Sequence, residues 1–570
     1  MGIKHFFSWL KNQFPEHITS FPKSELPHDI VIDTFMIDLN GIFHNSAQKI
    51  YEYGNHAKPR SMLRKTTPPP NRDSLKLQLA CFQDVCLTIE ELLIIAKPRK
   101  SLVMCIDGVA PQSKQNQQRQ RRYRGVMEDP YSSTRVGFDP CCITPGTKFM
   151  DNMSKYIDWF IRKRISDNYN SIWKNIEVVF SNEKVPGEGE HKLVNYIRKY
   201  GNDEDNYCIN ALDADLVMLS LASHKKNFYL LREDMYTPGI DYMYIDVGTG
   251  IRQKLIKELL RWEGCDDKKL VNDFILICFM CGNDFLPNIP SIAIMEKGLE
   301  TIIDMYKRTC MTEGHLTDDN NFFRKNAFQK FLSLISTSEK GLLEEKIINK
   351  VEYIPEPLLE KYITKTEEGI DLNFESYKKE YYEKKDLKNI ESVCHSYLDG
   401  CQWILTYYTQ GVTDWSWLYP YHYSPFCTDL AEHISTFEHK QPKHIPPLSP
   451  FQQLLCVLPP KSASLIPTPL NELLISKSSP IIKFCPDTFN INYEGKKKKW
   501  EGVVELPVVD FELVKKAYTS VVKNVSVIDM KRNIIGKSFK YNYSEDFCGE
   551  FKSYYGNIVS CKVNVEVLEF

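Results

Sequence analysis

The chain has 570 residues, and at roughly 150 residues per domain this length predicts two to four domains. Hydrophobic residues make up 42% and charged residues 26%, proportions that are typical of globular proteins and exclude a collagen-like or wholly disordered chain. The formal net charge of −2 provides no general attraction for a polyanion. Any nucleic-acid binding must therefore come from a local basic patch.

We expect no membrane span and no secretory signal. The apolar stretch over residues 274–281 is far shorter than the roughly 18 residues that a span needs, and the apolar block over residues 6–10 is too short for a signal peptide. The 17 cysteines are scattered without regular spacing, which predicts buried thiols of an intracellular protein rather than a disulfide framework. Cys278 and Cys281 form a CxxC pair inside an apolar helical run, and we expect them to pack in the core.

In chain order, residues 35–306 alternate short apolar runs with longer helical patterns. This alternation predicts an α/β fold with a mostly parallel central sheet and flanking helices. The strand candidates are residues 34–37, 102–106, 177–180, 207–212 and 228–231. We expect a first domain over residues 1–310, a charged insertion or linker over 311–374, a second and largely helical region over 375–520, and a short β-rich segment over 521–570. Residues 560–570 alternate as an edge strand would.

Acidic residues directly follow three of the strand candidates. They are Asp38, Asp107, and the pair Asp213 and Asp215. In open parallel sheets ligands bind outside the carboxyl ends of the strands, so we expect these side chains to converge. An aspartate at one strand end is by itself typical of a turn or a helix cap, but several at one sheet edge repel each other and favour a bound cation.

Two further segments add carboxylates at comparable places. The loop SNEKVPGEGEH carries Glu188 and Glu190, and CGNDFLP carries Asp284 after an apolar helix. Oxygen ligands of this kind suit hard cations such as Mg²⁺ or Mn²⁺, and two ions about 4 Å apart would hold a scissile phosphate. The pattern therefore predicts hydrolysis of a phosphodiester with two metal ions.

A basic stretch, KQNQQRQRRYR, begins at Lys114 and contains no acidic residue. On a helix, Lys114, Gln118, Arg121 and Arg122 fall at about 0°, 40°, −20° and 80°, which is one face roughly 100° wide. Such a face can bind one phosphate, because guanidinium groups bond phosphate oxygens in pairs. A solvated charged face is the alternative interpretation.

These residues resemble the family of XRN-type 5′→3′ exoribonucleases. The matching segments, in order, are MGIKHFFSWL, MIDLNGIFHN, IDGVAPQSKQNQQRQRRYR, CCITPGTKFM, VPGEGEHKLVNYIR, LDADLVMLSL and CGNDFLPNIPS, then GVTDWSWLYPYHYSPF and GKKKKWEGVVELP in the second region. The resemblance covers residues 1–310 and 375–520. The family's long carboxyl-terminal extensions have no counterpart here, so we expect a compact member.

The resemblance implies a PIN or flap-nuclease-like catalytic domain over residues 1–310, with the second region completing the active-site pocket. It assigns the catalytic metal ligands to Asp38, Asp107, Glu188, Glu190, Asp213, Asp215 and Asp284. It assigns recognition of a 5′ phosphate to Lys114, Gln118, Arg121 and Arg122. It assigns base stacking to His44 and to a tryptophan of the second region, for which Trp415 is the first choice and Trp417 the next.

The resemblance further implies a processive exoribonuclease that degrades single-stranded, 5′-monophosphorylated RNA to mononucleotides with two Mg²⁺ or Mn²⁺ ions. We expect a monomer that acts in RNA decay, without a membrane and in the cytoplasm rather than the nucleus. Two alternatives stay open at this point. One is a structure-specific DNA nuclease of the flap endonuclease type, and the other is an inert protein that binds RNA 5′ ends.

Overall fold

The computed structural model describes the chain apart from residues 1–2, 4, 28, 57–73, 129–137, 168–170, 211–212, 214, 235–236, 293, 295–297, 349–354, 368, 441–442 and 547–548. Within the described residues no helix is both long and apolar enough to cross a membrane. Of the cysteines in this part of the chain, all but Cys265 are buried, and all are free thiols. The prediction of buried thiols is confirmed, and Cys278 and Cys281 both lie in the core.

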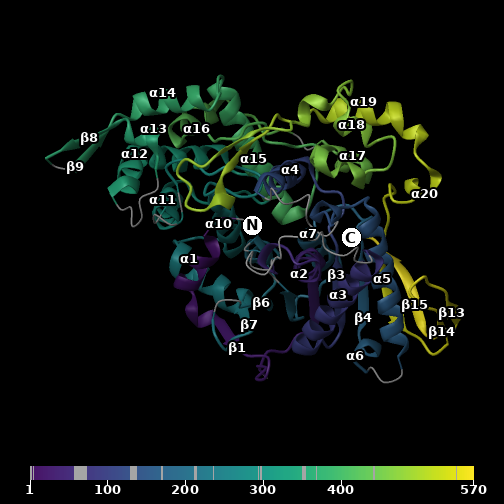
Figure 1. Cartoon of the computed structure of the whole chain (residues 1–570). Helices are drawn as coiled ribbons and strands as arrows, with labels where there is room; N and C mark the ends of the chain where they lie inside the picture. The colour runs from purple at the N-terminus through teal and green to yellow at the C-terminus, as the bar shows by residue number, and fades with distance from the viewer. Residues whose placement is uncertain are drawn as a thin grey trace.

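A nine-stranded sheet lies at the centre of the fold (Figure 1). Its order is β1 (Ile18–Phe21), β7 (Tyr242–Asp246), β6 (Phe228–Glu233), β5 (Tyr207–Asn210), β2 (Thr34–Asp38), β3 (Ser101–Cys105), β4 (Glu177–Ser181), β12 (Ser538–Tyr543) and β15 (Val563–Leu568). The five inner strands, from β6 to β4, run parallel, and the two strands at each end are antiparallel to their neighbours. The predicted mostly parallel sheet is confirmed, and β15 forms its edge as expected for residues 560–570.

The sheet is covered by helices on both faces because its inner strands are apolar on both sides. In β2, Phe35 and Ile37 join the core on one face, whereas Met36 joins the core on the other. The first face packs against α2 (Leu39–Tyr51), α3 (Ser74–Ala96) and α5 (Lys148–Ser166). The second packs against α1 (Phe6–Gln13), α7 (Gly189–Tyr200), α8 (Asp215–Ala222) and α10 (Asp267–Phe279).

The second core continues into helices far along the chain. It includes α11 (Gly298–Glu313), α12 (Lys325–Ile348), α15 (Ile390–Gln410) and α16 (Cys427–His433). Although we expect an insertion or linker over residues 311–374, α12 buries Phe328, Phe331 and Ile335 in this core. The same segment also contains α13 (Pro357–Glu360) and the strands β8 (Ile363–Thr366) and β9 (Gly369–Leu372), which pair antiparallel. The domain boundaries themselves stay predictions.

Helix α4 (Gln112–Glu128) lies between the sheet and the carboxyl-terminal helices (Figure 1). Arg119 is only 2% exposed and donates to the backbone oxygens of Pro507 and Phe484 at 2.9 and 2.5 Å. Of the later helices, α17 (Pro450–Val457) packs against α4. The same part of the chain also forms α14 (Phe374–Lys384), α18 (Glu472–Ile475), α19 (Phe511–Val521) and α20 (Val527–Met530). The basic stretch is thus a helix, as predicted, and one of its arginines anchors it to the second region.

Candidate active site

Four adjacent parallel strands, β5, β2, β3 and β4, end side by side and deliver most of the predicted carboxylates. Asp38 is the last residue of β2 and accepts a hydrogen bond from the backbone N–H of Asn40 at 3.2 Å, which caps α2. Asp107 lies two residues after β3, Asp215 opens α8, and Glu188 caps α7. The structure therefore brings these residues to one edge of the sheet. Asp213 is more exposed to solvent than the others, but its charge helps to raise the pKa of Asp38 and Asp215, so it lies near the same edge.

The backbone of the loop between β4 and α7 lies directly against these carboxylates, and two glycines permit the approach. The N–H of Gly189 donates to Asp107 Oδ1 at 2.6 Å, and a Cβ on Gly189 would stand 2.5 Å from Asp38 Oδ1. A Cβ on Gly108 would stand 1.8 Å from the backbone oxygen of Val185. No larger residue fits at either position, so the glycine in GEGEH has a packing role beside the acidic site.

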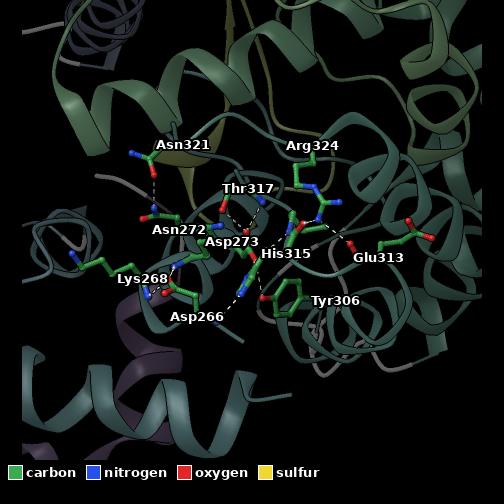
Figure 2. Close-up of polar contacts among 12 residues, drawn as sticks. Asp266, Lys268, Asn272, Asp273, Tyr306, Glu313, His315, Thr317, Asn321 and Arg324 are labelled. Carbon is green, nitrogen blue, oxygen red and sulfur yellow. Dashed lines mark hydrogen bonds and ion pairs between the residues drawn. The ribbon is translucent and has the colours of Figure 1, made fainter. Parts of the chain in front are cut away.

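Asp284 follows α10, and Asp273 anchors that helix from within. Asp273 is completely buried and accepts hydrogen bonds from the side chains of Tyr306, His315 and Thr317 at 2.9, 2.8 and 2.7 Å (Figure 2). The Nε2 atom of His315 accepts a backbone N–H at the start of α10 at 2.8 Å. The ring is therefore neutral, with its proton on Nδ1. This network fixes the helix that leads to Asp284.

Burial and mutual repulsion raise the pKa of several site carboxylates. Burial, with Asp107 nearby, raises the pKa of Asp38 to about 8. Burial, with Asp284 nearby, raises the pKa of Asp215 to about 7. The pKa of Glu190 lies well above its ordinary value, because burial is joined by the charges of neighbouring carboxylates. Positive charge among these groups would relieve the repulsion.

Lys114 supplies part of that positive charge. Its Nζ lies 2.5 Å from Glu188 Oε2 and 2.9 Å from Asp284 Oδ2. Burial would lower the pKa of Lys114, but the surrounding carboxylates outweigh it and hold the pKa well above its ordinary value. Of the predicted phosphate ligands, Lys114 is thus the one that the structure places among the acidic residues.

The donor set fits hard cations. In the described part of the chain no three His, Cys, Asp or Glu side chains are grouped closely enough to hold a metal ion. However, Asp215 Oδ1 is buried and has no hydrogen-bond partner there, and one lysine faces a cluster of carboxylates. Buried carboxylate oxygens without partners are what Mg²⁺ or Mn²⁺ would satisfy. The metal-ligand roles stay predictions.

The other three residues of the predicted phosphate face lie together beside the acidic site. Arg122 donates to Gln118 Oε1 at 3.4 Å and to Thr144 Oγ1 at 2.8 Å. Burial, with Arg121 nearby, lowers the pKa of Arg122 to about 10, so the group keeps its charge at neutral pH. Arg121 is exposed. Among the described residues no carboxylate forms an ion pair with Arg121, which suits an anionic ligand.

His44 lies on α2, close to both arginines. Burial, together with the charges of Arg121 and Arg122, lowers its pKa to about 3. The ring is therefore neutral at physiological pH. Its predicted role in base stacking is not tested by the structure.

The second region reaches the acidic site through α15. The hydroxyl of Tyr407 donates to Glu188 Oε1 at 2.8 Å, and the ring of His191 stacks on Tyr407 with centroids 3.6 Å apart. Neither ring nitrogen of His191 has a hydrogen-bond partner in the described residues. Sequence reasoning missed both residues, and the aromatic-rich stretch after Trp403 was the only signal for Tyr407.

The two candidate tryptophans differ in their surroundings. Trp417 stacks on Trp403 with centroids 4.8 Å apart, and its Nε1 donates to Asp399 Oδ2 at 3.1 Å. The backbone oxygen of Trp415 accepts from the N–H of Gln112 at the start of α4, at 2.9 Å. Trp415 thus lies beside the helix that carries the phosphate face, whereas Trp417 is engaged in packing.

Asn40 and Lys192 are two further residues that the sequence did not single out. Asn40 Nδ2 donates to Asp107 Oδ2 at 3.0 Å, and Asn40 Oδ1 accepts the N–H of Asp107 at 2.9 Å. Lys192 is buried and donates to the backbone oxygens of Asn182 and Val185 at 3.0 and 3.1 Å. These contacts hold the ends of β2, β3 and β4 in place. Asn40 lies in the segment MIDLNG and Lys192 in the segment GEGEHK, and both segments resemble the XRN-type family.

Comparison with known proteins agrees with this geometry. The family model for the XRN 5′-3′ exonuclease N-terminus matches residues 1–234, and the model for the Xrn1 helical domain matches residues 264–373 and 356–546. A 5′-3′ exoribonuclease 2 homolog of Drosophila melanogaster is 29% identical over 95% of this chain and 73% of its own length. The 5′-3′ exoribonuclease 1 of Schizosaccharomyces pombe is 28% identical over 97% of this chain and 51% of its own length.

The chain spans a smaller part of the human relative. Human 5′-3′ exoribonuclease 1 is 28% identical over 94% of this chain but only 35% of its own length. A solved structure of the catalytic core of Rad2 with a DNA substrate covers 62% of this chain and 80% of its own, at 13% identity and a TM-score of 0.31, a likeness too remote to bear on function. The two family models together match most of the sequence, and the chain therefore belongs to the family of XRN 5′→3′ exonucleases.

Proposed function

We propose that this protein is a processive 5′→3′ exoribonuclease that hydrolyses single-stranded, 5′-monophosphorylated RNA to mononucleotides, acting as a monomer with two divalent cations. The observation that carries the proposal is the placement of α4. Its basic face, with Gln118, Arg121 and Arg122, stands beside an edge of carboxylates that includes Asp38, Asp107 and others. A terminal phosphate bound on that face would place the first phosphodiester near the acidic edge.

The residues divide the work as follows. The carboxylates at the sheet edge would hold Mg²⁺ or Mn²⁺, which, when bound, neutralises phosphate charge and activates water. Arg121 and Arg122 would bind the terminal phosphate by charge-assisted hydrogen bonds. His44 would support the first base through its neutral ring, and stacking of this kind is worth about 1–3 kcal/mol per base.

The 5′ end provides the decisive experiment. One RNA sequence is prepared with a monophosphate, a hydroxyl or a cap at its 5′ end, and initial rates are measured for wild type and Arg121→Ala. We expect the monophosphate to be degraded at least about tenfold faster than the hydroxyl, since about 1.4 kcal/mol from one charge-assisted bond is a factor of ten. Arg121→Ala should shrink that preference by slowing the monophosphate substrate selectively.

Three results would contradict the proposal. Equal wild-type rates on monophosphate and hydroxyl ends would show that the basic face does not read the phosphate. Faster cleavage of a flap DNA than of any RNA would favour the flap endonuclease alternative. Binding of RNA ends without release of mononucleotides in Mg²⁺ would favour the inert binding protein.

A further inference from the structure

A polar recess with a volume of about 190 Å³ lies along α4, on the side that adjoins the predicted phosphate face. We call it the α4 recess. On α4 it is lined by Ser113, Asn116, Gln117, Gln120, Arg121 and Arg124. The facing wall comes from residues 281–288, 419–422 and 496–503. Asp284 and Arg121 both line it, so the recess opens directly beside the acidic edge and the phosphate face.

The walls of the α4 recess contain buried polar atoms without partners. Ser113 Oγ, Gln117 Oε1 and Asn283 Nδ2 are buried and make no hydrogen bond with any described residue, and Ser113 is only 3% exposed. Buried polar groups in proteins are nearly always hydrogen-bonded. Three such atoms around one recess therefore indicate a polar ligand with both donors and acceptors.

The recess continues away from the acidic site. A second cavity of about 110 Å³ is lined in part by the same residues, which are Pro287, Asn288, His422, Lys496 and Val503. It extends to Lys385 and Glu494. Because the two cavities share these five residues, they lie side by side and offer a passage that would begin at Asp284 and lead toward Lys385 and Glu494.

A processive exonuclease needs such a passage. After each cleavage the shortened RNA stays bound where the substrate enters, so the mononucleotide cannot leave by the same way without displacing it. Arg121 belongs to both the phosphate face and the α4 recess, and it can keep contact with the 5′ phosphate while the nucleotide moves. The amides of Asn116, Gln117 and Gln120 offer hydrogen bonds to ribose and base.

We propose that the α4 recess binds the released nucleoside 5′-monophosphate and is its way out of the active site. This inference rests on the proposed function, because it assumes that mononucleotides are produced at the acidic edge. It predicts that release of product, and not the hydrolysis step, depends on the residues of the recess.

The test narrows the recess without altering the catalytic groups. Gln120→Trp fills it, and Met127→Trp is the matched control, since Met127 lies on the same helix, is 50% exposed and does not line the recess. With enzyme in excess, the first nucleotide should be removed from 5′-monophosphorylated RNA by Gln120→Trp within about twofold of the wild-type rate. The following steps should slow at least about fivefold, giving a burst of one mononucleotide per bound RNA, because release becomes limiting.

A direct measurement of AMP binding tests the inference without relying on RNA hydrolysis. Labelled AMP is equilibrated with each protein in EDTA, and Gln120→Trp should bind it at least about fivefold more weakly than wild type and Met127→Trp. If Gln120→Trp does not fold, as judged by its melting curve, Gln117→Leu replaces it, with the same expectation for AMP.

The other outcomes would overturn the inference or, in the last case, the proposed function on which it rests. Equal AMP affinity and equal rates in Gln120→Trp and wild type would show that nothing passes through the recess. A first cleavage that slows as much as the later steps would show that the substitution disturbs the catalytic site. Weaker binding of the RNA itself, with unchanged AMP affinity, would assign the recess to the substrate. A wild type that binds AMP in the recess but cleaves no RNA would refute the proposed function and not the site.

Discussion

At the scale of single residues, His44 should make the free energy of unfolding depend on pH. In the unfolded chain its ring gains a proton below its ordinary pKa of about 6.5, whereas the folded ring stays neutral until about 3. The unfolded state therefore binds more protons in this interval, and the free energy of unfolding falls as pH drops from 6.5. The loss attributable to His44 should reach about 2 kcal/mol at pH 5.

Urea unfolding at pH 7 and pH 5 tests this expectation. His44→Phe should lose less stability than wild type between the two pH values, because the replacement cannot be protonated. His56→Phe, at an exposed position, is the control and should follow wild type. The same loss in His44→Phe and wild type would mean that the ring is not shielded from protonation.

Tyr407 is a positioning residue at the same scale. Burial raises the pKa of Glu188, while Lys114 and the hydrogen bond from Tyr407 counteract that rise. Tyr407→Phe removes the bond and should lower kcat about tenfold, or about 1.4 kcal/mol, with little change in RNA affinity. Tyr408→Phe is the control, since Tyr408 is the next buried residue of α15, whereas the hydrogen bond to Glu188 comes from Tyr407. If both variants turned over alike, Tyr407 would have only a packing role.

At the scale of elements, α10 depends on its buried aspartate. Asp273→Asn replaces one carboxylate oxygen with an amide N–H₂, which cannot accept hydrogen bonds. The groups that donate to that oxygen would then be buried without an acceptor. We expect the free energy of unfolding to fall by about 3 kcal/mol, as measured in urea. Asp267→Asn, exposed on the same helix, should change it by less than about 0.5 kcal/mol. A small effect at Asp273 would show that the network in Figure 2 does not hold the helix.

Helix α4 shows how one element serves two neighbours. The predicted face carries Lys114, Gln118, Arg121 and Arg122, whereas Arg119 bonds backbone oxygens of the second region. The sequence does not show which partner each of the five basic residues of KQNQQRQRRYR has. Their different partners follow from the rotation of the helix, which turns successive residues toward the sheet edge or toward the second region.

At the scale of the whole molecule, divalent cations should stabilise the fold. Because the edge gathers carboxylates whose pKa is raised by burial and repulsion, bound Mg²⁺ should favour the folded state. The gain should be about 1.4 kcal/mol where Mg²⁺ is at ten times its dissociation constant, and it should appear as a higher melting temperature. In EDTA, hydrolysis should stop while RNA binding remains.

Asp215→Ala checks the origin of that effect. The variant should lose hydrolysis, keep RNA binding and show a smaller Mg²⁺-dependent rise of the melting temperature, because it lacks one ligand. Glu25→Ala, an exposed acidic residue in the segment before β2, serves as the control and should behave as wild type. Near-normal turnover of Asp215→Ala in Mg²⁺ would show that the metal-site assignment is wrong.

Much of the site follows from local pattern. The strands are short apolar runs, and their aspartates come directly after them, so topology alone places Asp38 and Asp107 at one edge. Periodicity of 100° per residue gives the phosphate face of α4. The need for glycine at Gly189 is explained by Asp38, whose Oδ1 would lie 2.5 Å from a Cβ at that position. That distance cannot be predicted from the sequence.

The family, the parallel sheet and the acidic residues at its edge could be predicted from the sequence, because these depend on periodicity, turn chemistry and short motifs. The folded chain was needed to show that Lys114 lies between Glu188 and Asp284, that Tyr407 reaches Glu188 and that residues 325–348 join the core. Those contacts join segments far apart in the chain. Their partners are selected by packing and burial of the whole molecule, which no local pattern encodes.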